Sequence, residues 1–252
     1  MTRWTRGLES RLRNAIRRAP LPVRRALRRM TRSGPAPGLI RWGDLRSTLP
    51  FDRDWGYGRG TPIDRVYIET FLEAHASDVR GRCLEVLNSK YTERHGLDSV
   101  SAADVLDIDP VNLRATVIAD LGEENSLPEE RYDCFILTQT IHLVPDMKTA
   151  IANAHRALAP GGVLLLTVPG VGRHESRQGF AHDRWRVTSP GLEWLLEGPG
   201  WTNRTLTTFG NVLTATAVLL GLAVEELQPH EVAANDPDYP VIVACRAVKD
   251  AR

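Results

Sequence analysis

Two acidic residues, one inside a predicted strand and one at the end of the next, could bind a ribose. Glu85 lies inside a short apolar run, residues 83–87, which predicts a buried strand. A second such run, residues 105–109, ends in Asp109, about 24 positions after Glu85. An acidic residue inside one strand and another at the end of the next is typical of nucleoside-binding α/β folds. A carboxylate in an apolar strand also needs a polar partner, so we expect one for Glu85.

Two histidines could act as a general base. His142 follows a predicted strand, residues 134–140, and His182 follows the next, residues 163–169. An imidazole with a pKa near neutral is suited to take a proton from a hydroxyl group. Structural or exposed histidines are also common, so that alternative stays open for both. His182 precedes Asp183, but adjacency in sequence does not make the two a pair in space.

The elements that must position these residues alternate between apolar runs and helical patterns. The predicted strands cover residues 83–87, 105–109, 115–121, 134–140, 163–169, 204–209 and 239–248, and the main predicted helices begin near residues 61, 145, 189 and 211. Alternation of this kind predicts a parallel sheet covered by helices on both faces. Ligands bind such sheets at the carboxyl ends of the strands, which here collect Asp109, Asp120, Thr138 and His142.

The later motifs of this region resemble those of a known family. In order they are a strand, Asp-Leu, Tyr-Asp, a strand, Leu-Val-Pro-Asp, a helix, Leu-x-Pro-Gly-Gly and a strand. Residues 78–169 thereby resemble the class I S-adenosylmethionine-dependent methyltransferases, in particular the type 11-like proteins. The resemblance implies a Rossmann-like, seven-stranded, mostly parallel α/β sheet whose last strand is antiparallel.

The resemblance also implies the cofactor, S-adenosylmethionine, and a set of contacts to it. Asp109 matches the family's ribose-binding acid, and Asp120 with Leu121 matches its adenine-contacting pair. Glu85 matches the acidic residue of the first strand. The full set of expected cofactor contacts is Glu85, Leu87, Ser89, Asp109, Asp120, Leu121 and Thr138.

The loop after the first strand departs from the family pattern. Where the family has Glu-x-Gly-x-Gly-x-Gly, this chain has Leu87, Ser89 and Tyr91 in place of the glycines. Either a remodelled loop binds the cofactor, or the fold has lost it. Bacterial relatives of glycan and secondary-metabolite pathways show a similar Leu-Glu-x-x-x-x-x-Tyr-Thr motif, which favours the remodelled loop.

The N-terminal segment is a basic arm. Residues 1–32 hold eleven arginines and one glutamate, although the whole chain of 252 residues has a net charge of only +1. Trp4, Leu8, Leu12 and Ile16 recur every four positions and would share one helix face. The arm could be mobile, pack on the acidic body of the protein or on a partner, or lie on an anionic membrane surface through residues 2–32. Nucleic-acid contact is a further alternative, but no recognition motif supports it.

Composition divides the chain into three predicted parts. These are a basic arm and linker (residues 1–38), a cover segment (39–77) and a methyltransferase-like domain (78–252). No apolar run is long enough to span a membrane, no signal peptide is evident, and the three cysteines have no metal-site spacing. We therefore expect no metal, and a cytoplasmic bacterial protein, either free or peripheral at the inner face of the membrane.

Two functional hypotheses follow. The first is an S-adenosylmethionine-dependent methyltransferase that acts on a hydroxyl group of a small molecule, a glycan or a lipid-linked sugar, with His182 and His142 as candidate bases. The second is a catalytically inactive, methyltransferase-like scaffold for a partner protein. Methylation of nucleic acid is disfavoured, because Thr-Gln-Thr-Ile-His-Leu stands where base-methylating relatives carry an Asn/Asp-Pro-Pro-Tyr type motif.

Overall fold

The computed structural model describes Pro20, Val23, Pro35, residues 39–176 and residues 183–251. Contacts divide the chain into two units, Met1–Thr48 and Leu49–Arg252. The first unit includes the 3₁₀ helix η1 (Gly43–Arg46). Most of the basic arm lies outside the described residues, so its helices and its membrane contact stay predictions, as does the three-part division of the chain.

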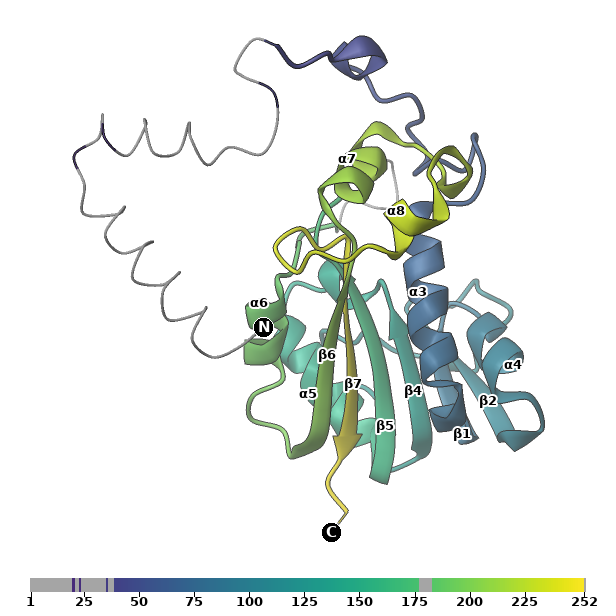
Figure 1. Cartoon of the computed structure of the whole chain (residues 1–252). Helices are drawn as coiled ribbons and strands as arrows, with labels where there is room; N and C mark the ends of the chain where they lie inside the picture. Colours follow the sequence, from purple (N-terminus) through teal and green to yellow (C-terminus); the bar gives the residue numbers. More distant parts are fainter. Residues whose placement is uncertain (1–19, 21–22, 24–34, 36–38, 177–182, 252) are drawn as a thin grey trace. The chain divides into compact units, whose positions relative to one another are not determined.

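The second unit is built on one seven-stranded sheet. Its strands are β1 (Gly81–Val86), β2 (Val100–Asp107), β3 (Val117–Ile118), β4 (Tyr132–Thr138), β5 (Leu158–Pro169), β6 (Trp201–Phe209) and β7 (Ile242–Lys249). They lie side by side in the order β3-β2-β1-β4-β5-β7-β6 (Figure 1). The pairs among β1 to β5 are parallel, and β7 is antiparallel to both β5 and β6. The predicted Rossmann-like sheet is therefore confirmed.

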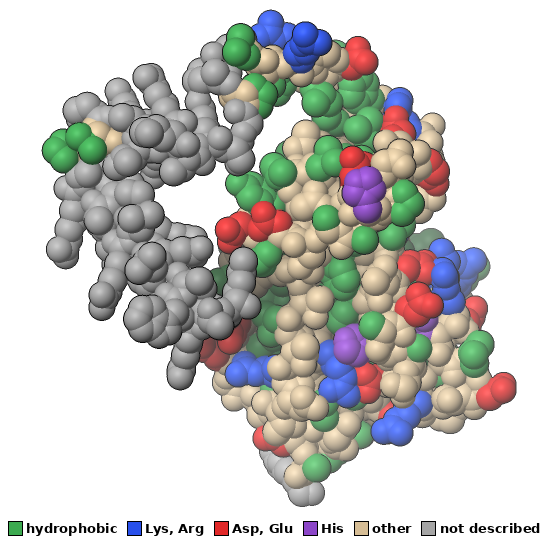
Figure 2. All heavy atoms as spheres, in the orientation of Figure 1, with side chains coloured by type: hydrophobic (Ala, Val, Ile, Leu, Met, Phe, Trp, Pro, Cys, Tyr) green, Lys and Arg blue, Asp and Glu red, His purple; other side chains and the backbone are tan. Residues whose placement is uncertain are grey.

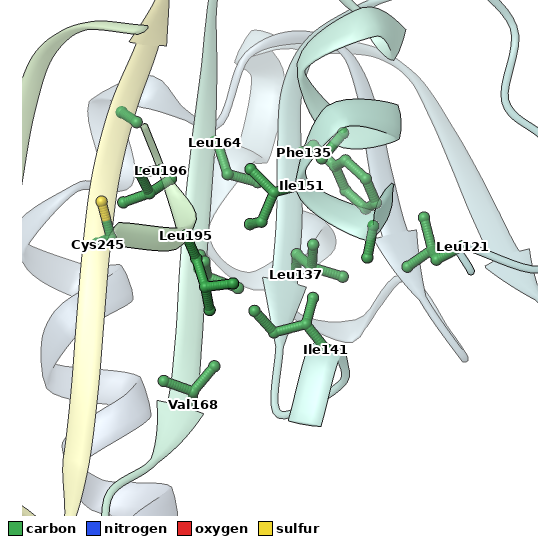
Figure 3. Close-up of a cluster of buried hydrophobic side chains, with 14 of the residues drawn as sticks. Leu121, Phe135, Leu137, Ile141, Ile151, Leu164, Val168, Leu195, Leu196 and Cys245 are labelled. Atoms are coloured by element: carbon green, nitrogen blue, oxygen red, sulfur yellow. The ribbon is translucent and has the colours of Figure 1, made fainter. Parts of the chain in front are cut away.

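Helices pack on both faces of this sheet. They are α3 (Ile63–Ala74), η2 (Ala76–Asp78), α4 (Lys90–Gly96), η3 (Leu97–Ser99), η4 (Ile141–Leu143), α5 (Met147–Ala157), α6 (Ser189–Leu195), α7 (Val212–Leu220), η5 (Val224–Glu226) and α8 (Pro229–Ala233). Phe71 of α3, Tyr91 of α4 and Ala217 of α7 belong to one buried apolar cluster. Ile151 of α5 and Leu195 of α6 belong to the other, which Figure 3 shows against β4, β5 and β7.

The central strands are buried because their sequences are apolar on both faces. Phe135 and Ile136 of β4, and Leu165 and Leu166 of β5, have no exposed surface although successive side chains point to opposite faces. A continuous apolar run is what a parallel strand covered on both sides requires. These strands therefore form a rigid base, and their carboxyl ends carry the candidate site.

Three further observations concern cysteines, membrane spans and metal sites. Cys83, Cys134 and Cys245 are buried free thiols. Within residues 39–176 and 183–251, no helix has the length and apolar character needed to cross a membrane. In the same ranges, no group of three or more His, Cys, Asp or Glu side chains is arranged to hold a metal ion.

The second strand ends earlier than predicted. Residues 105–109 were expected to form a strand ending in Asp109, whereas β2 ends at Asp107. The Asp107 carboxylate accepts the N–H of Asp109 at 3.0 Å, and the Asp109 carboxylate accepts the N–H of Val111 at 2.9 Å. These side-chain acceptors turn the chain away from the sheet, since they offer the backbone an alternative to the strand ladder.

Two further predicted elements are too long. The third strand, predicted over residues 115–121, is the two-residue β3. The helix predicted over residues 211–227 ends with α7 at Leu220, because Gly221 adopts a left-handed conformation with φ of 71°. A side chain at Gly221 would also collide with Asp52, whose carbonyl oxygen would lie 2.0 Å from the added Cβ.

Asn211 connects the start of α7 to α8. Its side-chain oxygen accepts the N–H groups of Leu213 and Thr214, at 2.9 and 3.1 Å. Its amide nitrogen donates to the carbonyl oxygens of Glu231 and Ala234, at 2.8 and 2.7 Å. One side chain thus fixes both helices above the carboxyl ends of the strands.

Replacing Asn211 with Ala should destabilise the fold by about 2 kcal/mol, because a helix cap and two further hydrogen bonds are lost together. Urea unfolding of the purified protein would measure this loss. Asn235→Ala is the matched control, since the exposed Asn235 side chain makes one longer hydrogen bond to Thr208, of 3.3 Å. Equal losses in the two variants would contradict the role assigned to Asn211.

Candidate active site

Glu85 binds the start of the helix that follows β1. Its carboxylate accepts the N–H of Tyr91 at 3.0 Å and the N–H of Thr92 at 2.7 Å. The side chain is buried, and this burial raises the pKa of the carboxyl group despite the two hydrogen bonds. The expected polar partner of Glu85 is therefore the N-terminus of α4, where the backbone N–H groups lack partners within the helix.

The loop between β1 and α4 keeps a glycine-like backbone without a glycine. Leu87 has φ of 73°, a left-handed conformation that costs a leucine about 1 kcal/mol. Its N–H donates to the carbonyl oxygen of Leu106 at 2.8 Å, and its own carbonyl accepts the amide of Asn112 at 2.9 Å. The side chain points outward and is 60% exposed. Ser89 precedes α4 and donates its hydroxyl to Glu93 at 2.5 Å.

The two aspartates near the end of β2 have different surroundings. Both carboxylate oxygens of Asp107 are used within the loop, by the N–H of Asp109 and by the amide of Asn112 at 2.6 Å. Asp109 is exposed, and only one of its oxygens accepts a hydrogen bond within the described chain, from Val111. Asp107 thus organises the loop, whereas Asp109 has a carboxylate oxygen available for a ligand.

The predicted adenine pair lies after β3. Asp120 is half-buried, and its carboxylate accepts the N–H of Gly122 at 2.7 Å. The side chain of Leu121 is only 5% exposed and belongs to the apolar cluster shown in Figure 3. Its carbonyl accepts the amide of Asn153 at 3.0 Å. Contact of either residue with the cofactor stays a prediction.

The carboxyl end of β4 presents Thr138 and, shortly after it, His142. Thr138 is half-buried, and its carbonyl accepts the hydroxyl of Thr140 at 2.8 Å. The backbone of Gln139 is left-handed, with φ of 46°, so the chain turns sharply into η4. This turn places the mostly buried His142 beside the loop that follows β5.

That loop contributes Asp183 as the partner of His142. One carboxylate oxygen of the buried Asp183 lies 3.9 Å from Nε2 of His142. The same carboxylate accepts two N–H groups of Arg186, at 2.6 and 2.9 Å, and the backbone N–H of Glu175 at 2.8 Å. His182, the other candidate base, lies outside the described residues. The tertiary structure therefore pairs His142 with the aspartate that follows His182.

The electrostatics of this pair favour a neutral imidazole. Burial lowers the pKa of His142 to about 4, although the nearby Asp183 opposes the change. Hydrogen bonds from Arg186 lower the pKa of Asp183 to about 2. His142 is therefore neutral at pH 7, and within the described chain its Nδ1 is buried without a hydrogen-bond partner. A neutral imidazole with an unpaired nitrogen is a proton acceptor.

The cover segment reaches the same region. The guanidinium group of Arg173 lies 4.1 Å from the ring centre of Trp55 and forms an ion pair with Glu175. The backbone carbonyl of Arg173 accepts a hydrogen bond from Arg186. Contacts thus run from the cover segment through the loop after β5 to Asp183 and His142.

A guanidinium group that sequence reasoning missed lies over the loop after β1. Arg65, in the first turn of α3, donates to the hydroxyl groups of Tyr57 and Tyr91, at 3.2 and 3.3 Å. Within the described chain it forms no ion pair with a carboxylate through its guanidinium group. Two neighbouring side chains are already paired within the protein, since Arg59 forms an ion pair with Glu226 and the hydroxyl of Tyr67 donates to the carbonyl of Val232. The charge of the neighbouring Asp64 acts on Arg65, but a half-buried guanidinium group that donates only to two hydroxyl groups is still suited to bind an acidic ligand group.

Glu85→Ala should lower the free energy of unfolding by about 3 kcal/mol, because two backbone N–H groups at the start of α4 lose a charged acceptor. Urea unfolding would measure this loss of unfolding free energy. Glu93→Ala removes a nearby exposed carboxylate whose described bond is to a hydroxyl, and it should cost no more than about 0.5 kcal/mol. A small effect of Glu85→Ala would show that Glu85 does not stabilise α4.

The low pKa of His142 should make stability fall as the solution is acidified. The unfolded imidazole takes up a proton near pH 6.5 but the folded one only near pH 4, so the unfolded state binds more protons between these values. Unfolding free energy should therefore drop by about 2 kcal/mol from pH 7 to pH 5 because of this group. His142→Gln should lack this part of the pH dependence in urea unfolding, and equal pH slopes would refute the assignment.

Comparisons with known proteins assign the family. The methyltransferase domain family matches residues 53–206, more than half of the chain. No curated protein sequence matches this chain. A solved S-adenosylmethionine-dependent methyltransferase from Mesorhizobium loti has a TM-score of 0.52 and 16% identity, over 74% of this chain and 100% of the other. A methyltransferase from Thermotoga maritima, described as a possible histamine N-methyltransferase, has a TM-score of 0.51 and 16% identity, over 77% and 95%.

At these identities the solved structures support the fold, and the family match covers the residues that form the candidate site. The seven-stranded sheet, with its order β3-β2-β1-β4-β5-β7-β6, agrees with the fold of these solved structures. The chain belongs to the methyltransferase domain family, within the class I S-adenosylmethionine-dependent methyltransferases, enzymes of class EC 2.1.1 whose cofactor is S-adenosylmethionine.

Proposed function

We propose that this methyltransferase transfers a methyl group to a hydroxyl group of a small molecule, a glycan or a lipid-linked sugar, and that His142 takes the hydroxyl proton. The observation that carries the proposal is the position of His142 at the carboxyl end of the sheet, with its Nε2 3.9 Å from the Asp183 carboxylate. A hydroxyl group is a weak nucleophile until a base removes its proton. His142 is neutral at pH 7 and can take this proton, although its pKa of about 4 makes it a weaker base than an ordinary imidazole.

The residues present fit the cofactor by the chemistry of their side chains. Asp109 has a carboxylate oxygen available for ribose hydroxyl groups, and Asp107 holds the Asp109 backbone in place. Arg65 offers a guanidinium group to the carboxylate of the methionine moiety. Leu87 is exposed at the same edge and offers apolar contact. S-adenosylmethionine, when bound, supplies an activated methyl group and leaves as a neutral thioether.

The protein's own groups then handle the proton. Nε2 of His142 faces Asp183, so a proton on Nε2 leaves Nδ1 to accept the hydroxyl proton, directly or through one water. The imidazolium formed in this way is stabilised by the negative charge of Asp183, whose carboxylate lies 3.9 Å from Nε2. Arg186 holds Asp183 in its charged form through two hydrogen bonds. The second candidate base, His182, stays a hypothesis on the same acceptor side.

The cellular location of the protein and its alternative role as an inactive scaffold remain hypotheses. The absence of a membrane-spanning helix is established for the described residues only. Contact of the basic arm with an anionic membrane surface, and a bacterial cytoplasmic location, rest on the arginine-rich sequence of residues 2–32. The inactive scaffold is the outcome that would follow if the cofactor does not bind.

Calorimetric titration with S-adenosylmethionine and S-adenosylhomocysteine tests the proposal. The wild-type protein should bind both ligands, and Asp109→Ala should weaken each by at least about tenfold, because a charged acceptor for ribose is lost. Asp98→Ala, which removes an exposed aspartate in η3, is the matched control and should bind like wild type.

Two results of this titration would count against the proposal. A folded wild-type protein that binds neither ligand would make the inactive scaffold the leading hypothesis. Equal affinities of Asp109→Ala and wild type would remove Asp109 from the site.

A separate rate measurement tests the base. A His142→Gln enzyme that keeps its cofactor affinity and its full rate with a hydroxyl acceptor would exclude His142 as the base.

A further inference from the structure

A half-open cavity of about 650 Å³ lies apart from the residues of the candidate active site. It is formed by α3, the carboxyl end of β6, η5, α8 and the residues just after α8, and its walls include Val66, Tyr67, Phe209, Leu227 and Val232. This volume is in the range of small-molecule sites, which are mainly apolar with a few polar groups. A mainly apolar wall favours a ligand with a substantial apolar part.

The polar groups of the wall are already occupied. The hydroxyl of Tyr67 donates to the carbonyl of Val232 at 3.0 Å, and the hydroxyl of Thr70 donates to the carbonyl of Val66 at 2.7 Å. The amide of Asn235 donates to Thr208 at 3.3 Å. These hydrogen bonds use the hydroxyl donors of Tyr67 and Thr70 and one amide N–H of Asn235, so the mostly apolar wall has few donors left for a polar ligand.

Charge at the cavity limits the nature of the ligand's polar end. Glu225 is the charged residue among those that line the cavity, and it accepts hydrogen bonds from the backbone and hydroxyl of Thr61. Glu231 of α8 adds a second carboxylate on a helix that borders the cavity. Two carboxylates would repel a fatty acid or a phosphate ester, so an uncharged polar end fits better.

The sheet register relates the cavity to the candidate active site. Phe209, in the cavity wall, pairs with Ile242 of β7, and Ile242 pairs with Pro169 at the end of β5. Two strand spacings are about 10 Å, so the wall lies that far from the point where the loop to Asp183 begins. An extended chain in the cavity could therefore belong to a molecule whose polar end reaches this edge.

The neighbouring helix is also apolar on its outer side. Val212, Leu213 and Leu219 of α7 are 58%, 42% and 49% exposed. Asn211 joins the start of α7 to α8, so this surface adjoins the cavity region. Figure 2 shows apolar side chains in the upper part of the folded core, where α7 and α8 lie. An exposed apolar surface next to an apolar cavity is typical of sites for amphiphilic ligands.

We propose that this cavity binds the alkyl chain of the methyl acceptor, an amphiphile with an uncharged, hydroxyl-bearing polar end. The inference rests on the proposed methyl transfer to a hydroxyl group and specifies the class of acceptor. Chain length then determines affinity through the cavity, while the hydroxyl-bearing end determines reactivity at the carboxyl edge of the sheet.

Calorimetric titration with hexyl, octyl and decyl β-glucosides, below their micelle concentrations, tests the proposal. Affinity should rise about two- to fourfold for each added methylene, because each one buries apolar surface. Decanoate should bind at least tenfold more weakly than decyl glucoside, because the carboxylates of Glu225 and Glu231 repel its negative charge. Affinity independent of chain length, or equal binding of decanoate, would overturn the proposal.

Variants with bulky side chains in the cavity test whether the alkyl chain binds there. Ala233→Trp fills the cavity from α8 and Thr70→Phe fills it from α3, and each should weaken decyl glucoside binding at least tenfold. Ala152→Trp places the same bulk on an exposed site of α5 and should have no effect. Unchanged binding in both cavity variants, or equal loss in the control, would place the chain elsewhere.

Titration of the same proteins with S-adenosylmethionine separates the two proposals. Cofactor binding without chain-dependent glucoside binding would reject the cavity and leave the methyltransferase proposal intact. Chain-dependent glucoside binding that the cavity variants abolish, in a protein that binds no cofactor, would reject methyl transfer and retain the cavity as a ligand site.

Discussion

The hydrogen bonds between Glu85 and the start of α4 are the contact on which the candidate cofactor site depends. A buried carboxylate in the middle of an apolar strand is stable only with strong donors nearby, and the N–H groups of Tyr91 and Thr92 are such donors. The pair fixes where α4 begins relative to β1. It therefore also fixes the short loop between them, including Leu87.

This arrangement explains how the loop can lack the glycines of its relatives. The backbone of Leu87 is held in a left-handed conformation by hydrogen bonds from both sides, to Leu106 and from Asn112. Asn112 also binds Asp107, so the loops after β1 and β2 are connected through one amide group. The conformational cost of a non-glycine residue is offset by bonds that hold both loops at the carboxyl edge.

The proposed acceptor side, around His142, depends on a different physical principle. His142 is desolvated, and Asp183, its anionic neighbour, is bound tightly by Arg186. The result is a neutral imidazole that can receive a proton and an adjacent carboxylate that stabilises the product of that transfer. About 10 Å from the start of the loop to Asp183, α3, β6 and α8 line a half-open, mainly apolar cavity, which is the site that we propose for an apolar chain.

The sequence by itself determined the fold, because the buried parallel strands must be apolar throughout and the intervening helices must carry one apolar face. It also determined that Glu85 needs a polar partner and that Asp109 lies near a strand end. Strand ends were less predictable, since Asp107 and Asp109 turn the chain through local side-chain bonds that do not change the apolar pattern. Only the tertiary structure decided that His142 meets Asp183 and that Arg65 lies over the loop after β1. These residues are far apart in the sequence, and they meet because parallel strands bring their carboxyl ends, and the loops that follow, to one edge.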